Sequence, residues 1–476
     1  MKQSLLDSVE YAIKYLEKFS SYAEARLESS DSSGFMMKNG LLEASSQDSY
    51  HGAGFRFIIG KSLGFFSTDN LAKKNIKKLA EKSIRATKKA ARLAEPISLG
   101  DEKRYSAKYD VKDREKISDF SPDRKVSLLK EINSALSKSA AERYFSIHDC
   151  VTEKYFINTS GSRIFSRIPR ISFYYNFSVL SGGKSSQRSW MYGASAGYEI
   201  LRKWNLPETL SRESEALLKN LAKGVRPPRG KVDVVCAPEI VAIMVHESAG
   251  HPGEADRVLG REAAQAGESF MTPAMLNTRI GSDLVNIADD PTIPGSYGYY
   301  LYDDEGVKAR KRMLIQGGMI NEFLQNRETA SFLGVQSNGA ARAVNYSVEP
   351  IVRMANTYFV PGKQKEEELI ESVKLGVYMK NFMEWNIDDV RLNQKYVGAE
   401  AYLIKNGRIV APVVKPVIET TTPALYSSVS GVADNLEFHS GTCGKGEPMQ
   451  AIPVWFGGPT VKLSKMEVLP KAARRF

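Results

Sequence analysis

The residues of this sequence with the clearest chemical potential are His246 and His251, which stand five positions apart with Glu247 directly after the first. Two imidazoles beside a carboxylate are what a hydrolytic zinc site requires, because the imidazoles bind the ion and a glutamate can accept a proton from a bound water. The chain has only five histidines. The pattern therefore predicts a metal site, and a capped helix end with two incidental histidines is the alternative.

The spacing of these histidines is one residue longer than the His-Glu-x-x-His pattern that places both ligands on one helical face. In an α-helix, five residues rotate a side chain by about 140°, so a straight helix cannot direct both rings at one ion. We therefore expect the helix predicted over 238–249 to unwind before His251. Gly250 can adopt the left-handed conformation that ends a helix, and Pro252 disfavours helical geometry at the residue before it.

A catalytic zinc normally takes three protein ligands, so a third must come from elsewhere in the chain. Cys443 lies in the glycine-rich segment 440–446, predicted to be a loop, where Lys445 would favour a thiolate. His439, four residues earlier, is the rival third ligand. The other side chains able to bind a metal are many carboxylates together with His51 and with three residues interpreted as structural, His148, Cys150 and Cys236.

The elements that must position these residues lie on either side of a linker candidate at 225–230, where two prolines and a glycine interrupt the pattern. Residues 1–225 are predicted to form an α+β N-terminal domain. Residues 230–476 are predicted to form a β-rich C-terminal domain that carries the zinc site. The fold class is therefore predicted to be α+β.

Local signals predict the individual elements of both domains. A strand over 22–28 is expected to end in a turn at 29–34, and Asn39 with Gly40 is a hairpin signal between strands. Antiparallel strands are expected over 144–197, and a further strand over 231–236. Apolar residues at helical spacing predict helices over 1–20, 122–136, 207–223 and 363–375.

Composition limits the class of protein. The apolar fraction is 42% and the charged fraction 25%, which is typical of globular chains, and no apolar run approaches the roughly 20 residues of a spanning helix. The charged, amphipathic start of the chain is not a signal peptide. Cys150, Cys236 and Cys443 are far apart and odd in number, which argues against a disulfide framework. These features predict a cytoplasmic protein without a membrane partner.

The net charge of +11 is unevenly distributed. The segment 71–95 carries nine basic residues against two glutamates and has a helical apolar stripe, which predicts an amphipathic helix with a basic outer face. Such a face could bind nucleic acid, an acidic peptide or anionic lipid. A solvated helix face is the preferred interpretation, because no aromatic residues interleave the charges and no nucleic-acid fold motif is present.

Several further motifs make the chain resemble the TldD/PmbA family of metallopeptidases, historically also called modulators of DNA gyrase. It resembles the catalytic TldD branch in particular, because His-Glu-x-x-x-His with a distant cysteine is highly specific to this family. The segment 101–141 aligns with nothing in the family. The matching segments run almost from end to end of the chain, at 54–68, 158–161, 237–239, 246–256, 303–306, 353–357, 443–445, Gln450 and 458–459.

The resemblance implies roles for particular residues. His246, His251 and Cys443 would be the ligands of Zn²⁺, and Glu247 would be the general base that takes a proton from a zinc-bound water. The protein would be a zinc-dependent peptidase that hydrolyses short or unfolded peptides, held as an added strand. The family also implies a two-subunit particle with the zinc facing an internal cavity. We therefore expect a homodimer, or a heterodimer with a PmbA-like paralogue that lacks these groups.

Two other functions compete with this prediction. The chain could be a non-enzymatic modulator that engages nucleic acid or a topoisomerase complex through segment 71–95, although nucleic acid is not favoured as a partner. The zinc could also be structural, but three ligands without an evident fourth speak against it.

Overall fold

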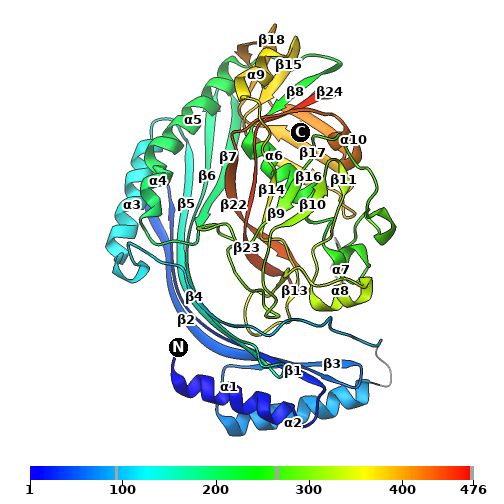
Figure 1. The fold of residues 1–476 in the computed structure, drawn as a ribbon. Helices are drawn as coiled ribbons and strands as arrows, with labels where there is room; N and C mark the ends of the chain where they lie inside the picture. The colour runs from blue at the N-terminus through cyan, green and yellow to red at the C-terminus, as the bar shows by residue number, and fades with distance from the viewer. Residues whose placement is uncertain (92–94, 263–266, 472–476) are drawn as a thin grey trace.

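The computed structural model describes residues 1–91, 95–262 and 267–471. Long strands near the N-terminus form one strongly curved sheet, and the C-terminal half of the chain lies against the inner side of this curve (Figure 1). Helices and sheets are both extensive, which confirms the predicted α+β class. The division into domains 1–225 and 230–476 stays a prediction.

The curved sheet has the strand order β3-β2-β1-β5-β6-β4, with β7 paired to β6. Every pairing in this sheet is antiparallel except that of β4 with β6, which is parallel. Several of its strands run through the whole curve, so the sheet is continuous from one end to the other (Figure 1). The strands are β1 (Tyr22–Lys38), β2 (Leu41–Ile59), β3 (Ser62–Thr68), β4 (Ser106–Asp110), β5 (Glu142–Asn158), β6 (Arg163–Ser181) and β7 (Lys184–Ala194).

Two groups of helices cover the outer face of this sheet (Figure 1). At one end, α1 and α2 bury apolar residues three and four positions apart, among them Val9, Ile13 and Ile76, in a common cluster with β1 and β2. At the other end, α3 and α5 pack on β5 and β6. The helices are α1 (Gln3–Leu16), α2 (Lys73–Ala90), α3 (Pro122–Leu136), α4 (Ile200–Trp204) and α5 (Leu206–Lys223), with a 3₁₀ turn η1 at Ile117–Asp119.

The helices predicted over 1–20, 122–136 and 207–223 are thereby confirmed. Helix α2 accounts for most of the basic segment 71–95, of which residues 92–94 lie outside the described residues. No helix in the described part of the chain is long and apolar enough to cross a lipid bilayer.

The expected turn at 29–34 is wrong, whereas the hairpin at Asn39 and Gly40 is confirmed. Strand β1 continues through 29–34 because these residues pair with β2 on one side and β5 on the other. Ladder hydrogen bonds on both edges outweigh the turn preference of the serines and glycine there. Asn39 and Gly40 both have positive φ, 49° and 88°, as a two-residue hairpin turn requires.

The C-terminal half contains two main sheets, ordered β11-β10-β9-β14-β23-β22 and β16-β17-β20-β24-β8-β15-β18-β19. Helix α6 packs against the first of these sheets and every one of its residues is buried. The remaining helices and turns are α6 (Pro238–Val245), η2 (His246–Gly250), α7 (Ala255–Val258), η3 (Pro273–Met275), α8 (Arg327–Leu333), α9 (Glu366–Glu371) and α10 (Thr422–Ser427).

The strand predicted over 231–236 is confirmed as β8, but the helix predicted over 363–375 is only the short α9, and β15 begins where that helix was expected to end. The strands of this half are β8 (Lys231–Cys236), β9 (Ile287–Asp289), β10 (Arg312–Gln316), β11 (Met319–Ile320), β12 (Ala341–Arg342), β13 (Ile351–Val352), β14 (Asn356–Phe359), β15 (Leu375–Met379), β16 (Phe382–Ile387), β17 (Asn393–Gly398), β18 (Ala401–Lys405), β19 (Arg408–Pro412), β20 (Pro416–Thr421), β21 (Val429–Val432), β22 (Glu437–Lys445), β23 (Gln450–Gly458) and β24 (Val461–Pro470).

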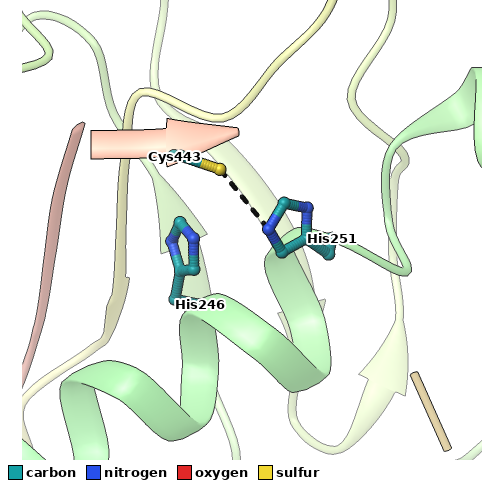
Figure 2. A group of neighbouring side chains, drawn as sticks. All are labelled: His246, His251 and Cys443. Atoms are coloured by element: carbon teal, nitrogen blue, oxygen red, sulfur yellow. Dashed lines mark hydrogen bonds between the residues drawn. The ribbon is translucent and has the colours of Figure 1, made fainter. Parts of the chain in front are cut away.

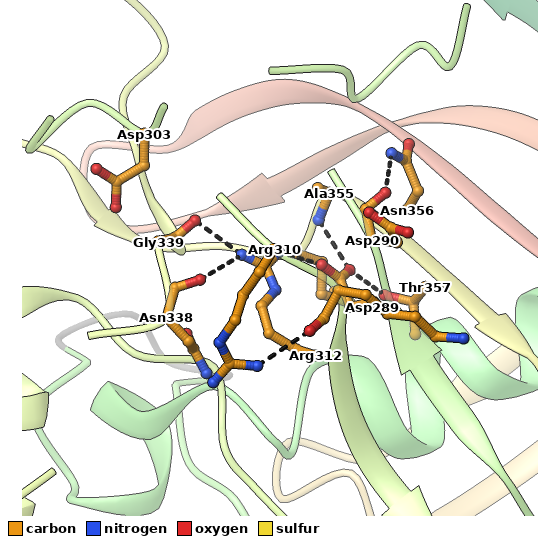
Figure 3. Close-up of polar contacts among 12 residues, drawn as sticks. Asp289, Asp290, Asp303, Arg310, Arg312, Asn338, Gly339, Ala355, Asn356 and Thr357 are labelled. Atoms are coloured by element: carbon orange, nitrogen blue, oxygen red, sulfur yellow. Dashed lines mark hydrogen bonds and ion pairs between the residues drawn. The ribbon is translucent and has the colours of Figure 1, made fainter. Parts of the chain in front are cut away.

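A buried ion pair between Asp289 and Arg312 joins the strands of the sheet beneath α6 (Figure 3). The second oxygen of Asp289 accepts hydrogen bonds from the Ala355 amide at 2.9 Å and the Thr357 hydroxyl at 2.8 Å. Arg312 also donates to the Gly339 carbonyl at 2.7 Å. Both side chains are fully buried, so each charge depends on the other for compensation.

We expect Arg312→Met to lower the free energy of unfolding by about 3–5 kcal/mol, because it leaves the Asp289 carboxylate buried without its partner. Arg310→Met is the matched control, since Arg310 is half-exposed and pairs with Glu322 at the surface. That change should cost less than about 1 kcal/mol. Denaturant unfolding measures both, and equal losses would contradict a structural role for the buried pair.

Candidate metal centre

Helix α6 continues directly into η2, a π-helical turn over His246–Gly250. Its defining hydrogen bond runs from the His251 amide to the His246 carbonyl, at 3.1 Å and five residues apart. The wider turn takes up the extra residue of the His-Glu-x-x-x-His pattern, so both histidines lie on one face. Their ring centroids are 4.9 Å apart.

The predicted unwinding before His251 is therefore wrong, because the helix widens and does not stop. His251 keeps right-handed helical geometry, with φ −59° and ψ −49°, although Pro252 follows it. Gly250 is needed for a different reason than the expected left-handed cap. A Cβ at Gly250 would lie 1.9 Å from the sulfur of Met354, so only glycine lets these segments approach so closely.

Cys443 faces the two histidines from strand β22 (Figure 2). Its Sγ lies 3.4 Å from His251 Nε2, and one potential ligand atom from each of the three residues falls within 4.8 Å of the others. All three side chains are buried. The expected loop at 440–446 is wrong, because most of this segment belongs to β22 and pairs with β23, with Cys443 opposite Ile452.

The other candidate ligands are not part of this group. Within the described residues, His246, His251 and Cys443 are the one group of three metal-binding side chains this close together. His439 packs against the Trp190 ring at 5.4 Å, and burial lowers its pKa to about 3. Four further candidates lie on other strands, with His51 exposed on β2, Cys236 buried in β8, and His148 with Cys150 on β5.

The chemistry of this group fits a zinc ion. One ring nitrogen of His246, Nδ1, is buried and has no hydrogen-bond partner, an arrangement that is costly unless a ligand satisfies it. His251 Nδ1 lies 3.1 Å from Glu254 Oε2, which leaves Nε2 directed at Cys443. A carboxylate on the second nitrogen is the usual support of a metal-binding histidine. Two imidazoles and a thiolate are a donor set typical of zinc.

Glu254 is held in place by two buried cations. Its Oε2 accepts a hydrogen bond from Arg257 Nε at 2.8 Å and lies 3.4 Å from Lys445 Nζ. Burial raises the pKa of Glu254, but Lys445, His251 and Arg257 together lower it well below its ordinary value. Glu254 is therefore a carboxylate that can accept a hydrogen bond from Nδ1 of His251. This bond fixes the tautomer of the His251 ring.

Lys445 does not act on Cys443 as the sequence suggested. Its ammonium group donates to both oxygens of Asp256, at 2.6 and 2.8 Å. Burial raises the pKa of Cys443, but the neighbouring His251 and Arg353 lower it to about 7. The thiolate is thus favoured by His251 and Arg353.

Glu247 is clamped by two side chains from the β16–β17 region. Its Oε1 accepts a hydrogen bond from Trp385 Nε1 at 3.2 Å, and its Oε2 accepts one from Arg391 Nη1 at 3.0 Å. Burial raises the pKa of this carboxyl, whereas His251, His246, Arg391 and Trp385 lower it, and the net direction is downward. Glu247 is therefore ionised at neutral pH and oriented beside the histidines.

Sequence reasoning missed Glu254, Trp385 and Arg391. Glu254 offered a usable signal, because a carboxylate three residues after His251 can reach its ring. Trp385 and Arg391 offered none, since they lie about 140 residues from Glu247 in no recognisable motif. Arg391 has a positive φ of 66°, a backbone conformation that non-glycine residues adopt mainly where the surrounding structure imposes it.

Comparison with known proteins identifies the family. Models of the PmbA/TldA metallopeptidase match domain 1 at residues 23–87, the central domain at 115–221 and the C-terminal domain at 229–469. The expectation that segment 101–141 aligns with nothing in the family is therefore wrong for residues 115–141. The chain belongs to the PmbA/TldD family of metallopeptidases. This membership confirms the resemblance and the enzyme class predicted from the motifs.

Relatives of this PmbA/TldD chain cover most of its length. A metalloprotease of Methanothermobacter thermautotrophicus is 31% identical over 93% of this chain and 94% of its own. A zinc metalloprotease TldD homolog of Saccharolobus solfataricus is 31% identical over 57% of this chain and 58% of its own. The solved structure of TldE from Thermococcus kodakarensis shares the fold, with a TM-score of 0.74 at 19% identity over 97% of this chain and 99% of its own.

In the metal-free protein, Cys443 should titrate near pH 7, because His251 and Arg353 stabilise its thiolate. Absorbance near 240 nm should therefore rise as the pH is increased through about 7. Cys443→Ala should remove that step. Cys236→Ala is the matched control and should leave it, since burial raises the pKa of Cys236 to about 12. A step that survives in Cys443→Ala would show that another group titrates there.

Proposed function

We propose that this protein is a zinc-dependent peptidase in which His246, His251 and Cys443 hold the metal and Glu247 is the general base. The observation that carries the proposal is the convergence of three buried ligand atoms within 4.8 Å, beside a clamped carboxylate. The zinc metalloprotease name of the Saccharolobus solfataricus relative supports the choice of ion.

Each residue has a distinct task in this proposal. A zinc ion, when bound, supplies Lewis acidity that acidifies a water and polarises the scissile carbonyl. Glu247 accepts the proton of that water, and the hydrogen bonds from Trp385 and Arg391 aim its carboxylate. Glu254 keeps the proton of His251 on Nδ1, so that Nε2 presents its lone pair to the metal.

Three protein ligands favour catalysis over a structural role, because a catalytic zinc keeps one coordination position for water or substrate. The burial of the site favours small or extended substrates. His246, His251 and Cys443 are only 5%, 4% and 6% exposed, so a folded protein surface cannot reach them. Short or unfolded peptides are therefore the proposed substrates. Pairing with a second copy or a PmbA-like paralogue is part of the same proposal and rests on the family resemblance.

The first test is metal content. The purified protein should hold roughly one zinc per chain. Each of the variants His246→Ala, His251→Ala and Cys443→Ala should lose most of this zinc, because a site with three protein ligands binds the ion weakly once one ligand is removed. His439→Ala is the matched control and should keep the metal. Elemental analysis measures zinc, and thermal unfolding verifies folding. Full zinc in Cys443→Ala, or its loss in His439→Ala, would contradict the assigned ligand set.

The second test separates catalysis from metal binding. Glu247→Gln should retain zinc but lower peptide hydrolysis by roughly 10²–10⁴-fold, because an amide cannot accept the proton at neutral pH. Glu268→Gln, an exposed position, is the control and should change nothing. Rates are compared on an unstructured peptide at matched zinc content. Unchanged hydrolysis in Glu247→Gln would rule out the general-base role, and loss of zinc would mean that Glu247 supports the metal.

A further inference from the structure

A cavity of about 500 Å³ lies between the inner face of the curved sheet and the C-terminal half of the chain. Residues of β1, β5 and β6 form one wall, and the segments 297–304 and 451–453 form the other. The cavity is distinct from the metal centre. Of neighbouring residues on β22, Thr442 lines the cavity, whereas Cys443 projects from the opposite face toward the histidines, as alternate strand residues do.

Two arginines that line the cavity, Arg170 and Arg342, lack acidic partners. Arg170 Nε and Nη2 donate to the carbonyls of Tyr297 and Tyr299, at 3.1 and 3.2 Å. Arg342 Nη1 and Nη2 donate to the carbonyls of Met354 and Pro453, at 2.7 and 2.9 Å. Among the described residues, no carboxylate lies within salt-bridge distance of either guanidinium. Carbonyl oxygens orient these groups but do not neutralise them.

Some buried arginines of this chain have acidic partners, whereas Arg353 donates to the carbonyls of Gln450 and Cys443 and, among the described residues, has no ion pair. Arg56 pairs with Glu24 at 2.7 Å and with Glu305 at 2.6 Å. Arg188 likewise pairs with Glu239 at 2.6 Å. A buried charge is costly unless an opposite charge compensates it, and the fold provides that compensation at these positions. Arg170 and Arg342 resemble Arg353 in lacking it, and they differ from Arg353 in lining a cavity.

The acids that line the cavity do not fill this role. Asp304 pairs with Lys154 at 3.0 Å. Glu28 accepts a hydrogen bond from Tyr50 at 2.6 Å and also lies near Lys154. Asp303 accepts hydrogen bonds from the amides of Glu305, Val307 and Ala341, at 3.0, 2.9 and 3.0 Å, so its oxygens are directed at the backbone. Burial lowers the pKa of Arg342 to about 10, and Asp304 partly opposes this effect. In the described part of the chain, neither Arg170 nor Arg342 has an acidic group in direct contact, so each can accept one from a ligand.

We propose that this cavity binds a carboxylate of the peptide substrate, either its C-terminus or an acidic side chain, through Arg170 and Arg342. The assignment of the anion to a peptide rests on the proposed function. The cavity volume lies within the range of sites that enclose small ligands. Guanidinium groups that are already oriented by carbonyls can bind a planar carboxylate with little loss of side-chain entropy.

The test is calorimetric binding to metal-free protein, so that no metal can ligate the carboxylate. The probes are a short unstructured peptide without Asp or Glu, its C-terminal amide, and an amidated version with one internal Glu. The free acid should bind about 10- to 100-fold more tightly than the amide, as expected for hydrogen bonds to a charged group. Recovery of affinity by the Glu peptide would assign the site to side-chain carboxylates as well, and no recovery would assign it to the C-terminus.

Arg170→Gln should abolish the difference between acid and amide, and Arg170→Lys should keep part of it. Arg167→Gln is the matched control, because Arg167 lies on the same strand but pairs with Asp113 outside the cavity. It should leave the preference intact. Thermal unfolding verifies that each variant folds.

Equal binding of acid and amide by the wild type, or an equal loss in Arg167→Gln, would overturn the carboxylate site. Hydrolysis of the same peptides by the zinc-loaded protein keeps the two proposals apart. Cleavage without any carboxylate preference would overturn this site alone. A preference that depends on Arg170 in a protein that cleaves nothing would support this site and contradict the peptidase.

Discussion

The hydrogen bond from the His251 amide to the His246 carbonyl is the interaction on which the candidate metal centre depends. It closes a π-turn and places on one face two rings that an α-helix would direct about 140° apart. The turn is possible because Gly250 leaves room for Met354. A side chain at that position would push the helix away from the chain that packs on it and separate the two rings.

Buried charge holds the rest of the centre in place. Glu254 fixes His251 and is itself compensated by Arg257 and Lys445. Glu247 is oriented by Trp385 and Arg391. Buried ions of this kind contribute little net stability but allow few alternative arrangements, because any displacement leaves a charge without its partner. The side chains of the candidate centre are thereby held in one geometry.

Buried ion pairs also join the two halves of the chain. Arg56 on β2 binds Glu305 beyond the linker, and Arg188 on β7 binds Glu239 on α6. These pairs dock the curved sheet against the half that carries the metal centre, and the cavity lies at that junction. Arg170 and Arg342 line it without acidic partners among the described residues, unlike the paired Arg56 and Arg188, which is why we propose that it binds a carboxylate.

The sequence by itself determined what depends on local signals. Apolar spacing predicted the helices α1, α3 and α5, Asn39 with Gly40 predicted a hairpin, and the motif around His246 together with Cys443 indicated the candidate ligands and the family. Only the tertiary structure decided what depends on distant neighbours. Pairing on both edges kept β1 extended through 29–34, and pairing with β23 made a strand of the expected loop around Cys443. The π-turn could not be predicted from the sequence, because it depends on the packing of Met354 on Gly250. The hydrogen-bond partners of Glu247 could not be predicted either, because no local pattern connects them to it.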